Sequence, residues 1–134
     1  MKVDLWMGNA ARCLKSAATL LADDDTNSAC NRAYYAMHYA ARAALIAKGE
    51  GRLAMAKTHQ GLISGFSQHL IKSGELDIKL AGLLPLEANR RLVSDYQGDP
   101  LDAADAAASL GNAQIFVTAI ANWLLLQSSA DPQS

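Results

Sequence analysis

One stretch constrains the fold of this chain more than any other, the segment NSACNRAYYAMHYAARAALIAK at residues 27–48. At about 100° per residue, one side of a helix built from it is lined by small or apolar side chains. Small side chains let neighbouring helices approach closely, so such a helix can be covered on most of its circumference. The segment therefore predicts the central helix of a bundle, with a core side made of Cys30, Ala33, Met37, Ala40, Ala41 and Ala44.

The other side of this predicted helix carries a polar stripe. Each member alone has a structural explanation, because tyrosines bury their rings with the hydroxyl bonded and arginines extend to solvent. Desolvating several polar groups together calls for a partner surface, either a second subunit or a ligand. The stripe is thus a candidate contact surface, and its members are Ser28, Asn31, Arg32, Tyr35, His38, Tyr39 and Arg42.

Composition favours an all-α protein with a single domain. The chain has 134 residues, enough for one hydrophobic core, and 51% of them are hydrophobic with only three prolines. Much of this apolar content is alanine and leucine rather than the residues that favour strands. We expect one helical domain over residues 1–126, followed by a polar, disordered tail over residues 127–134.

Two further helices are predicted on either side of the central one. Residues 3–21 have apolar side chains at three- and four-residue spacing. The acidic run at residues 23–25 should then form a turn and cap the central helix, with Thr26, Asn27 or Ser28 as alternative caps. The central helix should end at the glycines of residues 49 and 51, and a third helix should begin at Thr58 and close at residues 73–74.

The remainder of the chain predicts two more helical segments. Residues 75–96 should be helical with a kink or break near residues 82–85, because Pro85 removes a backbone donor. A last helix should have Asp99 as its cap and Pro100 at its first helical position, and should run to about Leu126.

Charge and cysteine content restrict the partners and the compartment. The formal net charge is −1, so any nucleic-acid site must come from a local basic patch, for which Arg32, Arg42, Arg90 and Arg91 are available. Two cysteines among apolar neighbours indicate core residues in a reducing compartment. The sequence shows neither a leader pattern nor an uninterrupted apolar run long enough for a membrane span, so we expect a cytoplasmic protein without a membrane partner.

Most enzyme classes lack support in the sequence. Glycine-rich phosphate loops, nucleophile elbows and metal-binding motifs are missing, so no metal or cofactor is expected. Arginine, histidine and tyrosine remain, and these can support metal-independent RNA cleavage. Arg32 and His38 lie six positions apart, and on one straight helix they would not meet, so a joint role would need a partner chain. His59 lies at the core edge of the third predicted helix, where it is either a structural residue or a further binding residue.

Three motifs resemble one known family. NRAYYAMHYAARAAL in the central helix, KTHQGLISGFSQHLIKSGEL and RRLVSDY are similar to the corresponding segments of the HEPN superfamily, and specifically of its small prokaryotic branch UPF0332. The resemblance extends over residues 14–124. It implies an antiparallel bundle of four or five helices that is usually a homodimer.

The resemblance also implies a function and a site. Such proteins are commonly RNA-cleaving toxins of a two-component toxin–antitoxin or defence system, paired with a minimal nucleotidyltransferase that acts as the antitoxin. The superfamily's signature is an arginine followed by a histidine near the dimer interface. Carried over to this sequence, Arg91 is that arginine, while Asp95 and Tyr96 stand where the histidine is expected.

This departure from the signature keeps a second reading open. The protein could be a non-catalytic subunit that binds a nucleotide or the nucleotidyltransferase through the polar stripe and His59. Tyr96 is then also a candidate for nucleotidylation by the partner. A third reading makes the stripe an interface between two copies of the chain.

Overall fold

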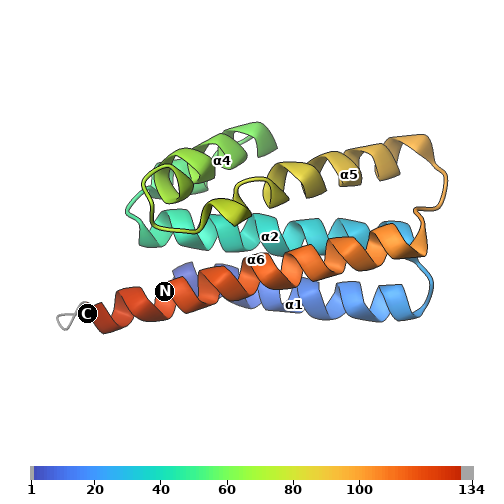
Figure 1. Cartoon of the computed structure of the whole chain (residues 1–134), viewed down its shortest axis with the longest axis horizontal. Coiled ribbons are helices and arrows are strands. Elements are labelled where there is room, and N and C mark those ends of the chain that lie inside the picture. Colours follow the sequence, from blue (N-terminus) through green and yellow to red (C-terminus); the bar gives the residue numbers. More distant parts are fainter. Residues whose placement is uncertain (1, 131–134) are drawn as a thin grey trace.

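The computed structural model describes residues 2–130, and every regular element within that range is helical (Figure 1). The predicted all-α class is therefore confirmed. The elements are α1 (Lys2–Ala22), α2 (Thr26–Ala47), α3 (Gly51–Ala54), α4 (His59–Phe66), the π-helical turn η1 (Ser67–Ile71), the 3-10 turn η2 (Ile78–Leu80), α5 (Leu83–Gln97) and α6 (Ala103–Ala130).

Helix α2 lies at the centre of the bundle, as its sequence predicts. It packs against α1, α3, α4, α5 and α6. Helices α1 and α2 run antiparallel, as do α5 and α6, and α4 and α5 cover the side of α2 that faces away from α1 (Figure 1). The alanines of α2 allow this close approach, because Ala33, Ala36 and Ala40 are all fully buried.

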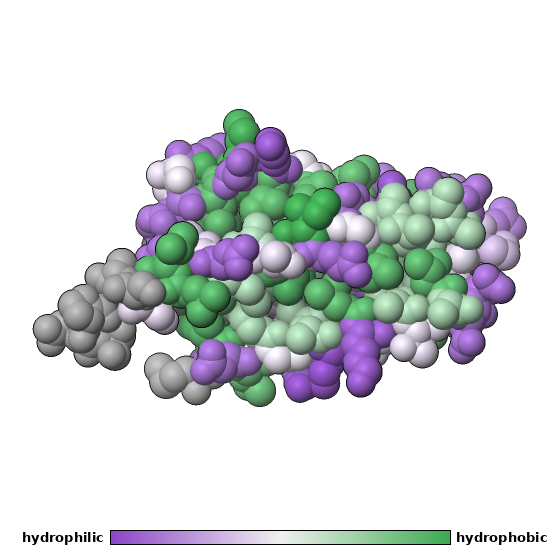
Figure 2. Space-filling view, turned by 60° about the horizontal axis from the view of Figure 1, so that its bottom comes forward, coloured by the Kyte–Doolittle hydropathy of each residue, from purple (hydrophilic) through white to green (hydrophobic). Residues whose placement is uncertain are grey.

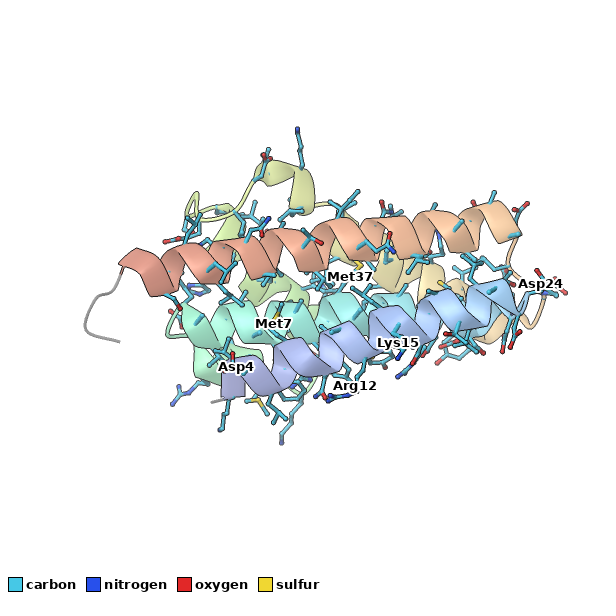
Figure 3. All side chains as sticks on the ribbon, turned by 90° about the horizontal axis from the view of Figure 1, so that it is seen from below. Asp4, Met7, Arg12, Lys15, Asp24 and Met37 are labelled. Atoms are coloured by element: carbon cyan, nitrogen blue, oxygen red, sulfur yellow. The ribbon has the colours of Figure 1, made fainter. Side chains whose placement is uncertain are left out.

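Larger side chains from the other helices fill the space left by these alanines. Phe66 of α4 and Phe116 of α6 meet with their ring centroids 5.2 Å apart. Leu62 and Ile120 are also fully buried in the same core. Figure 3 shows Met37 of α2 between α1 and α6, where its side chain is fully buried. Burial of each such side chain contributes about 1.5–3 kcal/mol to folding.

The acidic turn between α1 and α2 caps the central helix. The Asp25 side chain accepts a hydrogen bond from the Ser28 backbone N–H at 3.3 Å, and Asp24 takes a positive φ of 61° at the tip of the turn (Figure 3). The alternative caps at residues 26–28 are not used, because the helix has already begun at Thr26.

The predicted helical segment over residues 75–96 is wrong in its first part, because residues 75–82 contain only the 3-10 turn η2 and non-helical turns. The predicted break near residues 82–85 is the start of α5. Gly82 precedes the helix, and Pro85 lies in its first turn, where the missing backbone N–H has no helical partner to lose. Thr58 caps α4 as predicted, since its hydroxyl accepts from the Gly61 N–H at 3.0 Å.

The predicted start of the last helix at Asp99 is wrong. The Asn27 side-chain amide donates to the Asp99 carbonyl at 3.2 Å and accepts from the Leu101 N–H at 2.7 Å, which holds this segment out of the helix. The cap is instead Asp102, whose carboxylate accepts from the Ala104 N–H at 2.6 Å. Helix α6 continues to Ala130, beyond the expected start of the tail at residue 127, and residues 131–134 lie outside the described part of the chain.

Helix α6 is long and apolar enough to pass a length and composition test for a membrane span. An 18-residue window within Ala103–Ser128 has a mean hydropathy of 1.3, and 33% of that window is buried inside the bundle. Its buried residues include Phe116 and Ile120 of the core. Its exposed residues include the polar Gln114 and Asn122, and Figure 2 shows polar side chains in a row across an otherwise apolar face.

Candidate functional site

The side chain at the centre of the candidate site is Tyr34, which the predicted stripe did not include. It lies on α2 and is fully buried. Its hydroxyl is 2.6 Å from Nδ1 of His59, at the start of α4, and 3.4 Å from Nδ1 of His38, one helical turn further along α2. The two histidine rings are in contact, with centroids 4.8 Å apart. Tyr34, His38 and His59 therefore form a polar cluster between α2 and α4.

Arg42 extends this cluster along α2. Its Nε donates to Nε2 of His38 at 3.0 Å. Its guanidinium also lies over the ring of Trp6 of α1, 5.1 Å from the centroid, and Trp6 stacks on Tyr39 at 5.4 Å. Arg42 and Tyr39 of the predicted stripe thus belong to one connected surface, to which α1 contributes a tryptophan that the motif analysis missed.

Helix α5 brings Arg91 to the same place. The Arg91 guanidinium carbon lies 5.3 Å from the ring centroid of Tyr34 and 5.8 Å from that of Tyr35. Its Nη1 donates to the Asp95 carboxylate at 3.0 Å, and the side chain of Arg91 is 15% exposed. Its buried Nε has no hydrogen-bond partner within the described residues. Arg91 is thus positioned by two aromatic rings and one carboxylate.

Arg32 occupies the other end of the stripe. Its guanidinium lies over Tyr35 at 5.2 Å, and it donates to the side-chain carbonyl of Asn31 at 2.9 Å. It does not contact His38 directly, in agreement with the helical positions of the two residues, although both lie against the ring of Tyr35. A polar hollow of about 390 Å³ opens beside Arg32 and reaches Asp95, and a second of about 290 Å³ lies between Arg32 and Arg12 of α1.

The predicted site residues therefore fall into two groups. Arg91, Asp95, His59 and the stripe residues Arg32, Tyr35, His38, Tyr39 and Arg42 form one connected cationic and aromatic group, of which His38 is buried and the others are partly exposed. Tyr96 is 85% exposed on α5 and takes no part in these contacts. Arg12 borders the surface from α1, where it projects on the side away from α6 (Figure 3). We call this the arginine–aromatic face.

Burial and positive charge keep the histidines of this face neutral. Burial, with added repulsion from Arg42, His59 and Arg91, lowers the pKa of His38 to about 3. Burial and the charges of Arg91 and Arg42 also lower the pKa of His59. Burial raises the pKa of Tyr34 to about 12. At neutral pH the three side chains are therefore uncharged, and the positive charge of the site belongs to the arginines.

Arg90 does not contribute to this face, which corrects its place in the expected basic patch. Its Nη1 is 3.1 Å from Glu87, a fully buried carboxylate of α5. Glu87 also accepts hydrogen bonds from the Ser109 hydroxyl at 2.6 Å and from the Asn112 amide at 2.9 Å, both on α6. This network joins α5 to α6 and neutralises Arg90.

The described residues contain no cluster of three or more His, Cys, Asp or Glu side chains suited to a metal ion. What the arrangement offers chemically is a set of cations and N–H and O–H donors beside aromatic rings. Arginines of this kind bind phosphate groups, and aromatic rings stack on nucleobases.

Comparison with known proteins identifies the family. The HEPN domain profile matches residues 3–123. The chain belongs to the HEPN domain family. This HEPN protein is 33% identical over 94 residues to a UPF0332 protein of Thermotoga maritima, a match that covers 70% of this chain and 68% of the relative. A UPF0332 protein of Gloeobacter violaceus is 36% identical over 110 residues, covering 81% of this chain and 79% of the relative.

A third relative of this HEPN protein has a name that refers to function. It is a protein of Methanocaldococcus jannaschii named as a candidate toxin, 30% identical over 87 residues, which are 65% of this chain and 56% of the relative. The family resemblance found in the three sequence motifs is thereby confirmed.

Proposed function

We propose that this HEPN protein is the toxin-like component of a two-component toxin–antitoxin or defence system, and that its activity is metal-independent cleavage of RNA. Family membership and the relative named as a candidate toxin support the toxin-like role. The observation that carries the RNA-directed part is the position of Arg91. Its guanidinium is held against Tyr34 and Tyr35 in the middle of the arginine–aromatic face.

The cleavage step needs three groups. The 2′-oxygen of a ribose attacks the adjacent phosphorus, the bond to the 5′-oxygen breaks, and the products are a 2′,3′-cyclic phosphate and a 5′-hydroxyl. Arg91 neutralises the charge that develops on the phosphate oxygens. The Asp95 carboxylate, 3.0 Å from Arg91 and 40% exposed, accepts the proton of the 2′-hydroxyl. Tyr96 is five positions after Arg91 on α5 and therefore about 140° around the helix from it, so the exposed Tyr96 hydroxyl that supplies the proton to the leaving oxygen comes from a second copy of the chain.

The partners we propose are a second copy of the chain and a minimal nucleotidyltransferase antitoxin, in the cytoplasm. Support comes from the outer side of α5, where several large apolar side chains are exposed beside the site. Leu86 is 46%, Leu92 42%, Val93 41% and Tyr96 85% exposed. Residues three, four and seven apart share one side of a helix, so these four form a continuous apolar strip.

The test is induction of the protein in a heterologous bacterium, followed by mapping of cellular RNA ends. Wild type should arrest growth and produce new ends that carry a 2′,3′-cyclic phosphate. Arg91→Ala should do neither, while Arg52→Ala, the same change at an exposed arginine of α3, should behave as wild type. New ends that persist in Arg91→Ala would refute the assignment, and a wild type without new ends would refute the ribonuclease.

A second function is favoured by one observation, the absence of a histidine after Arg91. In this case the protein is a non-catalytic subunit that binds a nucleotide or a nucleotidyltransferase through the arginine–aromatic face. Tyr39→Ala and Arg42→Ala would then weaken the complex with a minimal nucleotidyltransferase in a pull-down. Arg91→Ala would leave any growth effect unchanged, in contrast to the ribonuclease.

A further inference from the structure

Four side chains of the arginine–aromatic face form a hydrogen-bond chain whose direction is fixed at one end. Arg42 can only donate, so Nε2 of His38, 3.0 Å from Arg42 Nε, must accept. Neutral His38 therefore carries its single ring proton on Nδ1, which faces the Tyr34 hydroxyl at 3.4 Å. The distance is long for a hydrogen bond, but it places a donor against the tyrosine oxygen.

The Tyr34 hydroxyl in turn determines which ring nitrogen of His59 accepts a hydrogen bond. Tyr34 is fully buried, so its hydrogen needs an acceptor inside the protein. His38 Nδ1 is occupied by its own proton, and the other ring nitrogen in contact with the hydroxyl is His59 Nδ1, at 2.6 Å. His59 Nδ1 is thus an acceptor. The remaining proton of neutral His59 is on Nε2, the ring nitrogen that the chain leaves free.

We propose that His59 is held as a neutral hydrogen-bond donor, and that its Nε2–H binds, together with Arg91, a phosphate group of RNA or of a nucleotide. This inference rests on the proposed nucleic-acid role of the face. The two residues are brought together by shared neighbours, because the His59 ring and the Arg91 guanidinium both contact Tyr34 and Tyr35. The ring centroid of His59 lies 5.5 and 5.8 Å from those of the two tyrosines, and the guanidinium carbon of Arg91 lies 5.3 and 5.8 Å from the same two rings.

The same geometry excludes His59 as the general base of the proposed cleavage. One ring nitrogen already accepts from Tyr34, and the other carries a proton. The lowered pKa of His59 is consistent with this, since burial and the neighbouring arginines disfavour a second proton. Tyr34 and His38, which are both buried, are then positioning residues, and with Arg42 they set the tautomer of His59.

The first test is histidine ¹⁵N NMR on the wild-type protein, which reports the tautomer directly. We expect His59 as the Nε2–H form and His38 as the less common Nδ1–H form, with His69 of η1 as an internal reference. Tyr34→Phe keeps the ring but removes the hydroxyl, so His59 in this variant should become a mixture of tautomers. An Nδ1–H tautomer of His59 in the wild type would overturn the inference.

The second test measures binding of an RNA oligonucleotide with 2′-O-methyl riboses, which cannot be cleaved by attack of the 2′-oxygen. His59→Ala should weaken binding by about tenfold, the usual effect of losing one hydrogen bond to a charged group. His59→Gln places an amide N–H close to the position of Nε2 and should restore most of the affinity. Equal losses in both variants, or no binding by the wild type, would overturn the inference.

Failure of the inference and failure of the proposed ribonuclease are distinguishable. If the methylated RNA binds with the expected dependence on His59 but cellular RNA is never cut, the inference stands and the ribonuclease fails. If RNA is cut in an Arg91-dependent way while His59→Ala binds and cleaves as wild type, the ribonuclease stands and the inference fails.

Discussion

Acidification should destabilise this HEPN protein well before its carboxylates are protonated, because His38 is folded into the bundle in its neutral form. Its side chain is only 4% exposed and contacts Arg42 on one side and Tyr34 on the other. Burial and the adjacent positive charges lower its pKa from 6.5 to about 3. In the unfolded chain the same histidine takes up a proton near its ordinary pKa.

The size of the effect follows from this difference. Because the folded pKa is the lower one, the stabilising contribution is fully present above pH 6.5 and is lost as the pH falls from 6.5 toward 3. Between pH 7 and pH 5 the loss from His38 is about 2 kcal/mol, at about 1.4 kcal/mol per pH unit once the unfolded form is protonated. The pKa of His59 is also lowered, so it adds to the loss in the same window. Glu75 contributes only at lower pH, since the Lys48 and Trp123 hydrogen bonds lower the pKa of its carboxyl from 4.5.

The measurement is urea denaturation followed by circular dichroism at pH 7, 6 and 5, with wild type, His38→Gln and His69→Gln compared at one protein concentration. His69, which lies 3.5 Å from Glu50 and outside the contacts of His38, is the control for the loss of a histidine elsewhere in the chain. His38→Gln lacks the buried titrating group and should show a much smaller fall. A wild type that loses less than half of the expected amount, or a His38→Gln variant with the wild-type slope, would refute the reasoning.

Three further predictions concern stability. Glu87→Gln removes the charge that binds Arg90 and weakens the hydrogen bonds from Ser109 and Asn112, so the free energy of unfolding in urea should fall by about 1–3 kcal/mol. The control, Asp23→Asn, removes one negative charge at an exposed position after α1 and should have little effect. Phe116→Ala opens a cavity against Phe66 and should cost about 3–5 kcal/mol in the same assay, unlike Ile115→Ala at its 59% exposed neighbour. Gly98→Ala forces a side chain into a φ of 76° and should lower the melting temperature by the equivalent of about 1–2 kcal/mol, while Gly111→Ala, inside α6 with open space at its Cβ, should raise it. Equal shifts for the two glycine variants would contradict the conformational explanation.

The helices could be predicted from sequence because their information is local. The apolar spacing of α1, the caps at Asp25 and Thr58 and the break at Pro85 each depend on a few consecutive residues. The start of α6 depends instead on Asn27, which is distant in the sequence and holds residues 99–101 in a non-helical conformation. Helix-cap patterns use only neighbouring residues and cannot include a contact with Asn27, so the sequence predicts Asp99 as the cap although Asp102 is the cap in the structure.

The candidate site could be predicted only in outline for a similar reason. The stripe was interpreted as the contact surface for a second subunit or a ligand, but α4 and α5 of the same chain pack against α2, and His38 is buried. Tyr34 escaped notice because it lies at the edge of the predicted core side, and its role depends on His59 from another helix. Glu87 could not be recognised as a buried residue, since its partners Ser109 and Asn112 come from α6.

The two adjacent arginines of α5 differ in a way that decides which of them can bind a ligand. Arg90 is paired with Glu87, whose side chain is fully buried, and breaking such a pair costs about 3–5 kcal/mol because it leaves a buried charge uncompensated. Arg91 is paired with Asp95, whose side chain is 40% exposed, and a pair of this kind is worth about 0–1 kcal/mol because the released carboxylate is hydrated. A phosphate group can therefore displace Asp95 from Arg91 at little cost, and the displaced carboxylate stays beside it, where the proposed reaction needs a proton acceptor. Arg90 has no such freedom, so it is Arg91, held against Tyr34 and Tyr35, that is available to a ligand.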